Sequence, residues 1–136
     1  MIKVIVGGKG SGKTARLVDD LNAQATSDAA NVVCIEYGQR LDQMVKYKIR
    51  LIDITEYPVG GYDQLLSFIA GISAKDYDLT HIYIDSIIKV SGNPNLEDLE
   101  AFLTKLSAFS DKNSFSVMII LSADPESLPE GIRNYC

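Results

Sequence analysis

Short, nearly unbroken apolar runs recur along the chain, separated by polar turns and by stretches with helical spacing. Such runs are typical of strands that helices cover on both faces, because each face of the strand then meets a core. The pattern predicts five strands, near Lys3–Val6, Val32–Glu36, Arg50–Ile54, His81–Asp85 and Ser116–Leu121.

Helices are predicted between these strands. A helix-like segment covers approximately Thr14–Ala25, and apolar residues recur at helical spacing over Tyr62–Ser73. A third helix follows Asn93, which can cap it, while Pro94 suits its first turn. Strands alternating with helices predict an α/β fold, a three-layer α-β-α sandwich around a mainly parallel five-stranded sheet.

The composition is that of one folded domain. With 136 residues, 46% of them hydrophobic, residues 1–136 are expected to form a single domain around its own core. A net charge of −5 argues against binding to nucleic acid or to a membrane surface. No apolar tract is long enough for a transmembrane helix, and a strand at the very start leaves no room for a signal peptide. Cys34 in an apolar run and Cys136 at the end suggest reduced thiols, so we expect a cytoplasmic protein.

One glycine-rich segment carries most of the chemical information. GGKGSGKT matches the pattern G-x-x-x-x-G-K-[ST] and lies between a predicted strand and a predicted helix. Glycines let successive N–H groups curl into an anion-binding nest, which the positive end of the helix strengthens. Lys13 can reach the β- and γ-phosphates of a nucleotide, which makes it a candidate catalytic residue, and the Thr14 hydroxyl can bind Mg²⁺. The predicted nucleotide-binding residues are Gly7, Gly8, Lys9, Gly10, Ser11, Gly12, Lys13 and Thr14.

A second motif predicts a metal ligand. The run His81–Ser86 begins as an apolar strand and reaches an acid at Asp85. An aspartate at the carboxyl end of a central strand can hold Mg²⁺ directly or through water, beside Thr14. The alternative is that Asp85 caps a turn.

Polar residues at the ends of two other predicted strands are candidates for supporting hydrolysis. Ser86 stands where many ATPases carry a glutamate that orients water, so Glu36, at the end of the second predicted strand, is the candidate for that role. The alternative for Glu36 is a structural strand-end role. Ser122 and Asp124 follow the last apolar run, where a polar residue can sense the γ-phosphate, and Ser122 is a candidate nucleotide-binding residue. Loop chemistry is the alternative for the Asp124-Pro125 pair.

In order and spacing, these segments resemble the RecA-like branch of the P-loop NTPases over nearly the whole chain. The resemblance implies ATP or ADP with Mg²⁺ as ligands, and a site commonly completed by a neighbouring subunit. With the strands lettered A to E in chain order, it implies the sheet order C-B-D-E-A. GGKGSGKT and IYIDSIIKV look like the Walker A and Walker B motifs of this branch, and VVCIEYGQRLD, LIDITEYPVGGYDQLLSFIA and VMIILSAD look like its second, third and sensor strands.

Departures from that family bear on function. Gly38, two residues after Glu36, stands where RecA proteins carry their catalytic glutamate, which affects hydrolysis rather than binding. The short connection Ile88–Asn95 leaves no room for a DNA-binding loop, so strand exchange is not expected. The first strand would lie at an open edge of the sheet, where either the segment Pro125–Cys136 or another subunit must cover it.

We therefore predict a small cytoplasmic ATP-binding protein with weak or partner-dependent ATPase activity, as a homo-oligomer or with a protein partner. Two alternatives stay open. A small-molecule or nucleoside kinase has a similar phosphate loop, but Arg40, Arg50 and Arg133 form no lid segment. A kinase sheet would also place the fourth strand directly beside the first. A non-catalytic nucleotide-sensing module is consistent with Ser86 and Gly38.

Overall fold

Five parallel strands form one continuous sheet in the computed structural model, which describes residues 1–136. The sheet order is β1-β5-β4-β2-β3, and every neighbouring pair is parallel. Read from the opposite edge, this is the predicted order C-B-D-E-A, which is confirmed. The strands are β1 (Ile2–Gly7), β2 (Val32–Glu36), β3 (Arg50–Asp53), β4 (His81–Ile84) and β5 (Ser116–Ser122).

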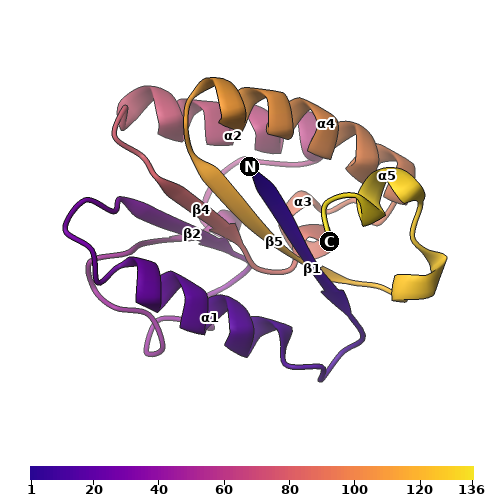
Figure 1. The fold of residues 1–136 in the computed structure, drawn as a ribbon, viewed down its shortest axis with the longest axis horizontal. Helices are drawn as coiled ribbons and strands as arrows, with labels where there is room; N and C mark the ends of the chain where they lie inside the picture. Colours follow the sequence, from indigo (N-terminus) through magenta and orange to yellow (C-terminus); the bar gives the residue numbers. More distant parts are fainter.

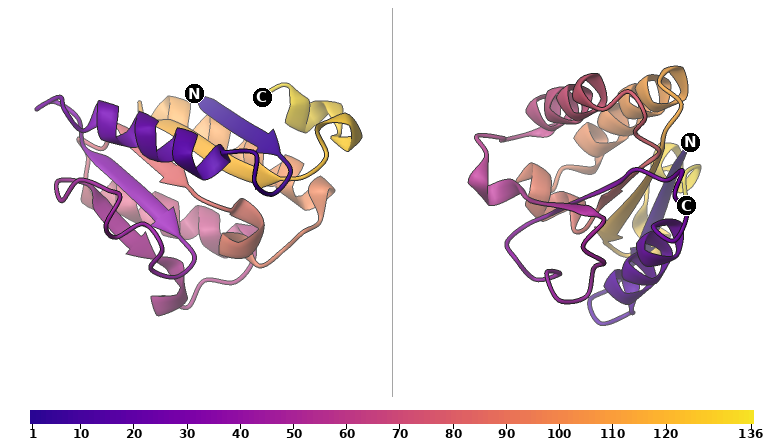
Figure 2. Two further views of the ribbon diagram at one scale, coloured as in Figure 1. Left: turned by 90° about the horizontal axis from the view of Figure 1, so that it is seen from below. Right: turned by 90° about the vertical axis from the view of Figure 1, so that its left-hand side faces the viewer.

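Helices cover both faces of this sheet. Figure 1 shows α1 on one face and α2 with α4 on the other, which gives the expected three layers. The view along the sheet in Figure 2 shows the same separation. The helices are α1 (Lys13–Gln24), α2 (Tyr62–Lys75), α3 (Ile87–Ser91), α4 (Leu96–Lys112) and α5 (Glu130–Arg133), with short 3-10 turns η1 (Ile54–Glu56) and η2 (Pro125–Ser127). No helix is long and apolar enough to cross a membrane.

The sheet separates two hydrophobic cores, which explains why its strands are apolar on both faces. Strand β2 illustrates this: Val33 and Ile35 belong to the larger core, whereas Val32 and Cys34 belong to the smaller one. The larger core holds 24 buried residues, including those of α2 and α4, and the smaller holds 11, including those of α1. Each fully buried leucine or isoleucine contributes about 1.5–3 kcal/mol by leaving water. The two-sided burial therefore holds the carboxyl ends of the strands in fixed positions.

The start of α4 differs from the prediction. Asn95, not Asn93, is the N-cap: its side-chain oxygen accepts the N–H of Asp98 at 2.9 Å. Asn93 instead shapes the preceding turn, where its Oδ1 accepts the N–H of Asn95 at 2.9 Å. Pro94 accordingly precedes the helix and does not belong to its first turn. The connection from β4 also contains the short helix α3 before it reaches this cap.

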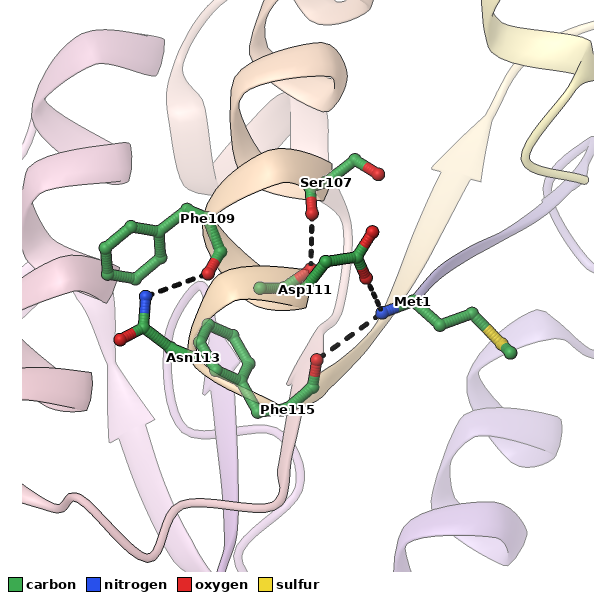
Figure 3. A network of polar contacts seen from close by, with 7 residues as sticks. Met1, Ser107, Phe109, Asp111, Asn113 and Phe115 are labelled. Atoms are coloured by element: carbon green, nitrogen blue, oxygen red, sulfur yellow. Dashed lines mark hydrogen bonds and ion pairs between the residues drawn. The ribbon is translucent and has the colours of Figure 1, made fainter.

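The chain termini meet at the β1 edge of the sheet (Figure 2). Ile132 of α5 is fully buried, and the N–H of Val4 donates to the carbonyl of Tyr135 at 2.8 Å. On the other side, the amino group of Met1 lies 2.8 Å from Asp111 at the end of α4 (Figure 3). The segment Pro125–Cys136 thus supplies part of the cover that the edge strand was expected to need.

Candidate functional site

The loop between β1 and α1 is closed by its own polar groups. The ammonium group of Lys13 lies 2.6 Å from the carbonyl oxygen of Gly8 and 3.3 Å from the Ser11 hydroxyl. Gly12, the N-cap of α1, has a φ of 82°, which a residue with a side chain rarely adopts. A Cβ on Gly7 would lie 2.7 Å from the Ser11 hydroxyl, so a side chain at that position would force the Ser11 side chain to shift. The glycines therefore serve the local backbone geometry that the motif predicted.

The amino end of α1 is open to an anion. Neither a side-chain cap nor an acidic residue occupies its first turn. The first N–H groups of a helix have no partner within the helix, and the helix dipole makes this end positive. Lys13 adds a full charge at the same place, although its side chain is only 8% exposed.

A pocket of about 840 Å³ opens beside this loop. Four cationic side chains line it, and none of the chain's 18 acidic residues does so. In a chain with a net charge of −5, this is a strong local concentration of positive charge. Six of the predicted site residues line the pocket: Lys9, Gly10, Gly12, Lys13, Thr14 and Ser122.

Asp85 lies beside Thr14 as predicted. The Thr14 hydroxyl donates to Asp85 Oδ1 at 3.2 Å, across 71 residues of sequence. Asp85 is 3% exposed and does not itself line the pocket. Its N–H donates to the carbonyl of Ile35, which ties the end of β4 to β2. No group of three or more His, Cys, Asp or Glu side chains that could hold a metal ion occurs in the structure. A cation at this site would therefore need ligands beyond these side chains.

Glu36 is buried at the end of β2 and does not line the pocket. It is 2% exposed, and its Oε1 accepts the main-chain N–H groups of Arg40 and Leu41 at 2.9 and 3.1 Å. Its other oxygen, Oε2, is buried without a hydrogen-bond partner. Burial raises the pKa of the Glu36 carboxyl, the two main-chain donors oppose that rise, and the negative charges of Asp42 and Asp85 add to it. Glu36 does not line the pocket, so the structure gives it a clear structural contact and leaves its catalytic role a prediction.

Ser122 and Asp124 separate in the structure. Ser122, the last residue of β5, lines the pocket. Asp124 turns to its own loop: its carboxylate accepts the N–H of Glu126 and the hydroxyl of Ser127, both at 3.0 Å. The loop role considered for Asp124 is thus the one observed.

Two cations of the pocket were not assigned to the site from the sequence: Arg40, which was considered only as part of a kinase lid, and Lys89. Arg40 follows β2, and Lys89 belongs to α3, which follows β4. The only signal in the sequence was that both residues come soon after predicted strands whose carboxyl ends share one edge. Arg50 lies in β3 and Arg133 in α5, and neither lines the pocket.

Ser86 also lines the pocket and carries an unusual backbone. Its φ is 65°, and only one other non-glycine residue, Ser114, has a positive φ. Such a conformation costs about 1–3 kcal/mol and is often found at functional sites. It lets the chain turn sharply from β4 into α3 directly after Asp85.

Cys34 and His81 do not line the pocket. Cys34 is fully buried in the smaller core, and burial raises the pKa of its thiol. The ring of His81 contacts the Thr80 hydroxyl at 2.8 Å and stacks against Tyr83.

No protein-family model matches the chain, and no curated protein matches it either. The features that bear on function are therefore the geometry and charge of this pocket.

Proposed function

We propose that the chain is an ATP- and ADP-binding protein of the P-loop NTPase type with a minimal RecA-like core. The observation that carries this proposal is the glycine-rich loop Gly7–Thr14, five residues of which line a pocket that holds four cations and no acid. The N–H groups at the start of α1 and the Lys13 ammonium group would bind the phosphates. A pocket of about 840 Å³ falls within the range of about 300–1,000 Å³ that is usual for small-molecule ligands.

Thr14 and Asp85 fit the metal that such a nucleotide would bring. Mg²⁺ is usually held by one or two protein oxygens together with phosphates and water, so a cage of three carboxylates is not required. The Thr14 hydroxyl would bind the ion, and Asp85, 3.2 Å from that hydroxyl, would support it directly or through water. Bound Mg²⁺ would neutralise the negative charge of the phosphates.

We further propose that hydrolysis is weak or depends on a partner. The two candidate acids, Asp85 and Glu36, are both buried and absent from the pocket lining. Ser86 lines the pocket at the position where a water-orienting glutamate would be useful. A homo-oligomer or a protein partner in the cytoplasm could supply the missing group. A self-sufficient ATPase would have to use the unpaired oxygen of Glu36.

The sheet order bears on the kinase alternative. Strand β5 lies between β1 and β4, whereas the kinase arrangement would put β4 directly beside β1. This order favours the RecA-like proposal. A nucleotide-sensing module that does not hydrolyse ATP has the same fold and pocket, so turnover measurements must distinguish it from an ATPase.

Nucleotide titration of a Lys13→Ala variant tests the proposal. The variant should lose a charge-assisted contact worth about 1.5–3 kcal/mol, which is roughly 10- to 150-fold in affinity for ATP and ADP. Lys3→Ala is the matched control, because Lys3 is exposed on β1 and does not line the pocket. A folded Lys13→Ala protein that binds both nucleotides as tightly as the parent would show that the loop is not the phosphate site.

A further inference from the structure

The pocket carries more positive charge than the glycine-rich loop supplies. Lys9 and Lys13 belong to the loop, whereas Arg40 and Lys89 reach the pocket from the ends of two other strands. The chain forms only two ion pairs, Met1–Asp111 and Lys105–Asp63, so no carboxylate neutralises Arg40 or Lys89. Two unpaired cations in the lining of a pocket without an acid favour binding of a further anionic group there.

The backbone that carries Arg40 is anchored at two neighbouring strand ends. Glu36 Oε1 accepts the N–H of Arg40, and Asp53 Oδ1 accepts the N–H of Gly38 at 2.8 Å. Glu36 and Asp53 are register partners in β2 and β3, so both contacts rest on the sheet itself. Gly38 has a φ of 88°, which lets the chain turn back between these two contacts.

Glu36 is a destabilising residue at the end of β2. A buried carboxylate with one unpaired oxygen destabilises a fold, and an apolar residue of similar size would not carry this cost. The contacts it makes are to the main chain of Arg40 and Leu41. Its structural effect is thus to fix the main chain at Arg40, a residue that lines the pocket, and at the buried Leu41.

We infer that Arg40 and Lys89 form a second anion subsite, which adds contacts to a phosphate group besides those that the loop provides, and that Glu36 is the positioning residue for Arg40. This inference rests on the proposed nucleotide-binding function. The phosphate is either the terminal group of a bound triphosphate or a free phosphate that binds beside a diphosphate. Arginine suits both, because its planar guanidinium group donates two parallel hydrogen bonds to phosphate oxygens.

Calorimetric titration distinguishes these sources. MgATP, MgADP and inorganic phosphate added to the MgADP complex are titrated into the parent, Arg40→Ala and Lys89→Ala proteins. Arg50→Ala is the matched control, since Arg50 is exposed on β3 and absent from the pocket lining. We expect Arg40→Ala to weaken ATP binding about tenfold or more while ADP affinity stays within about twofold of the parent. Loss of phosphate binding to the MgADP complex, with ATP and ADP unaffected, would support the subsite and identify a separate phosphate.

Other outcomes overturn the inference. If Arg40→Ala changes ATP, ADP and phosphate binding by one common factor, or no more than Arg50→Ala does, there is no second subsite. If the parent protein binds ATP and ADP but Arg40→Ala gives either of these results, only the subsite is refuted. A parent protein that binds neither nucleotide refutes the proposed function and the subsite together.

The positioning role of Glu36 has its own test. Glu36→Gln keeps an oxygen at the same reach, so it should retain the preference for ATP or phosphate. Glu36→Asp keeps the charge but is one methylene shorter, so it should lose the preference as Arg40→Ala does. If Glu36→Asp retains the preference and Glu36→Gln loses it, charge rather than position matters, and the positioning role is wrong.

Discussion

Replacing Asp85 by asparagine would separate a metal-supporting role from a folding role. Asparagine keeps the shape and an oxygen that can still accept the Thr14 hydroxyl, whose donor atom lies 3.2 Å away. It removes the negative charge that would attract Mg²⁺. Residues that support a metal ligand typically change metal affinity by about 10–100-fold when they are altered, which corresponds to about 1.4–2.7 kcal/mol. Most of the gain in ATP affinity that Mg²⁺ provides should therefore disappear.

The stability of the fold, unlike the Mg²⁺-dependent affinity for ATP, should not fall in the Asp85→Asn variant. Asp85 is 3% exposed, and the Thr14 hydroxyl is its only side-chain hydrogen-bond donor. Removing a poorly compensated buried charge costs the fold nothing and can stabilise it by about 1 kcal/mol or more. For a domain of this size, about 1 kcal/mol raises the melting temperature by roughly 3–5 °C. The variant should thus melt at the same temperature as the parent or a few degrees higher.

Two measurements decide the matter. ATP is titrated with and without Mg²⁺, and thermal unfolding is followed by calorimetry on the same samples. Asp124→Asn is the matched control, because that carboxylate follows β5 but contacts only its own loop. If Mg²⁺ strengthens ATP binding equally in the parent, Asp85→Asn and Asp124→Asn proteins, the assignment of Asp85 to the metal is refuted. A large loss of thermal stability would instead identify Asp85 as a structural strand-end residue.

The remaining predictions concern ATP turnover, the pH dependence of stability and the cover of β1. The isolated monomer should release phosphate from ATP more slowly than the usual enzyme range of about 1–10³ per second, because no acid lines the pocket; brisk turnover that Glu36→Gln abolishes would contradict this. Burial raises the pKa of the Glu36 carboxyl, with Asp42 and Asp85 adding to the rise, so ionised Glu36 costs stability at neutral pH. As the pH falls through the folded-state pKa, the unfolding free energy of the parent should rise relative to that of Glu36→Gln. Urea titrations from pH 7 to pH 4 measure this difference in unfolding free energy, and a constant difference would argue against the prediction. Ile132→Ala should cost about 2–5 kcal/mol and promote self-association by loosening the cover of β1, which denaturation and sedimentation would measure.

Most of the fold could be predicted from local sequence patterns. Strand and helix signals depend on the spacing of apolar residues, and strand β2 was predicted with the bounds that the structure has, Val32–Glu36. The sheet order came from the resemblance to RecA-like proteins, and it agrees with the structure. The cap of α4 was predicted wrongly, because Asn93 and Asn95 have the same capping chemistry and only the turn between them selects one.

The candidate site, too, could be predicted from the sequence only in part. The glycine-rich loop could be predicted from neighbouring residues, since a strand, a turn with a positive φ and a helix start follow one another within a few residues. The contact between Thr14 and Asp85 could be predicted only by placing the segment that follows β1 and the end of β4 at the same edge of one parallel sheet.

The amino-acid sequence by itself determined the α/β class, the five strands and the glycine-rich loop between a strand and a helix, because each depends on neighbouring residues. Tertiary structure alone decided that Arg40 and Lys89 reach this pocket, that Glu36 holds the backbone of Arg40, and that no acid lines the cavity. The reason is that parallel strands bring the loops at their carboxyl ends to one edge of the sheet, whatever their distance in the chain. Which side chains of those loops then turn inward depends on contacts such as those of Glu36 and Asp53, which no periodic pattern encodes.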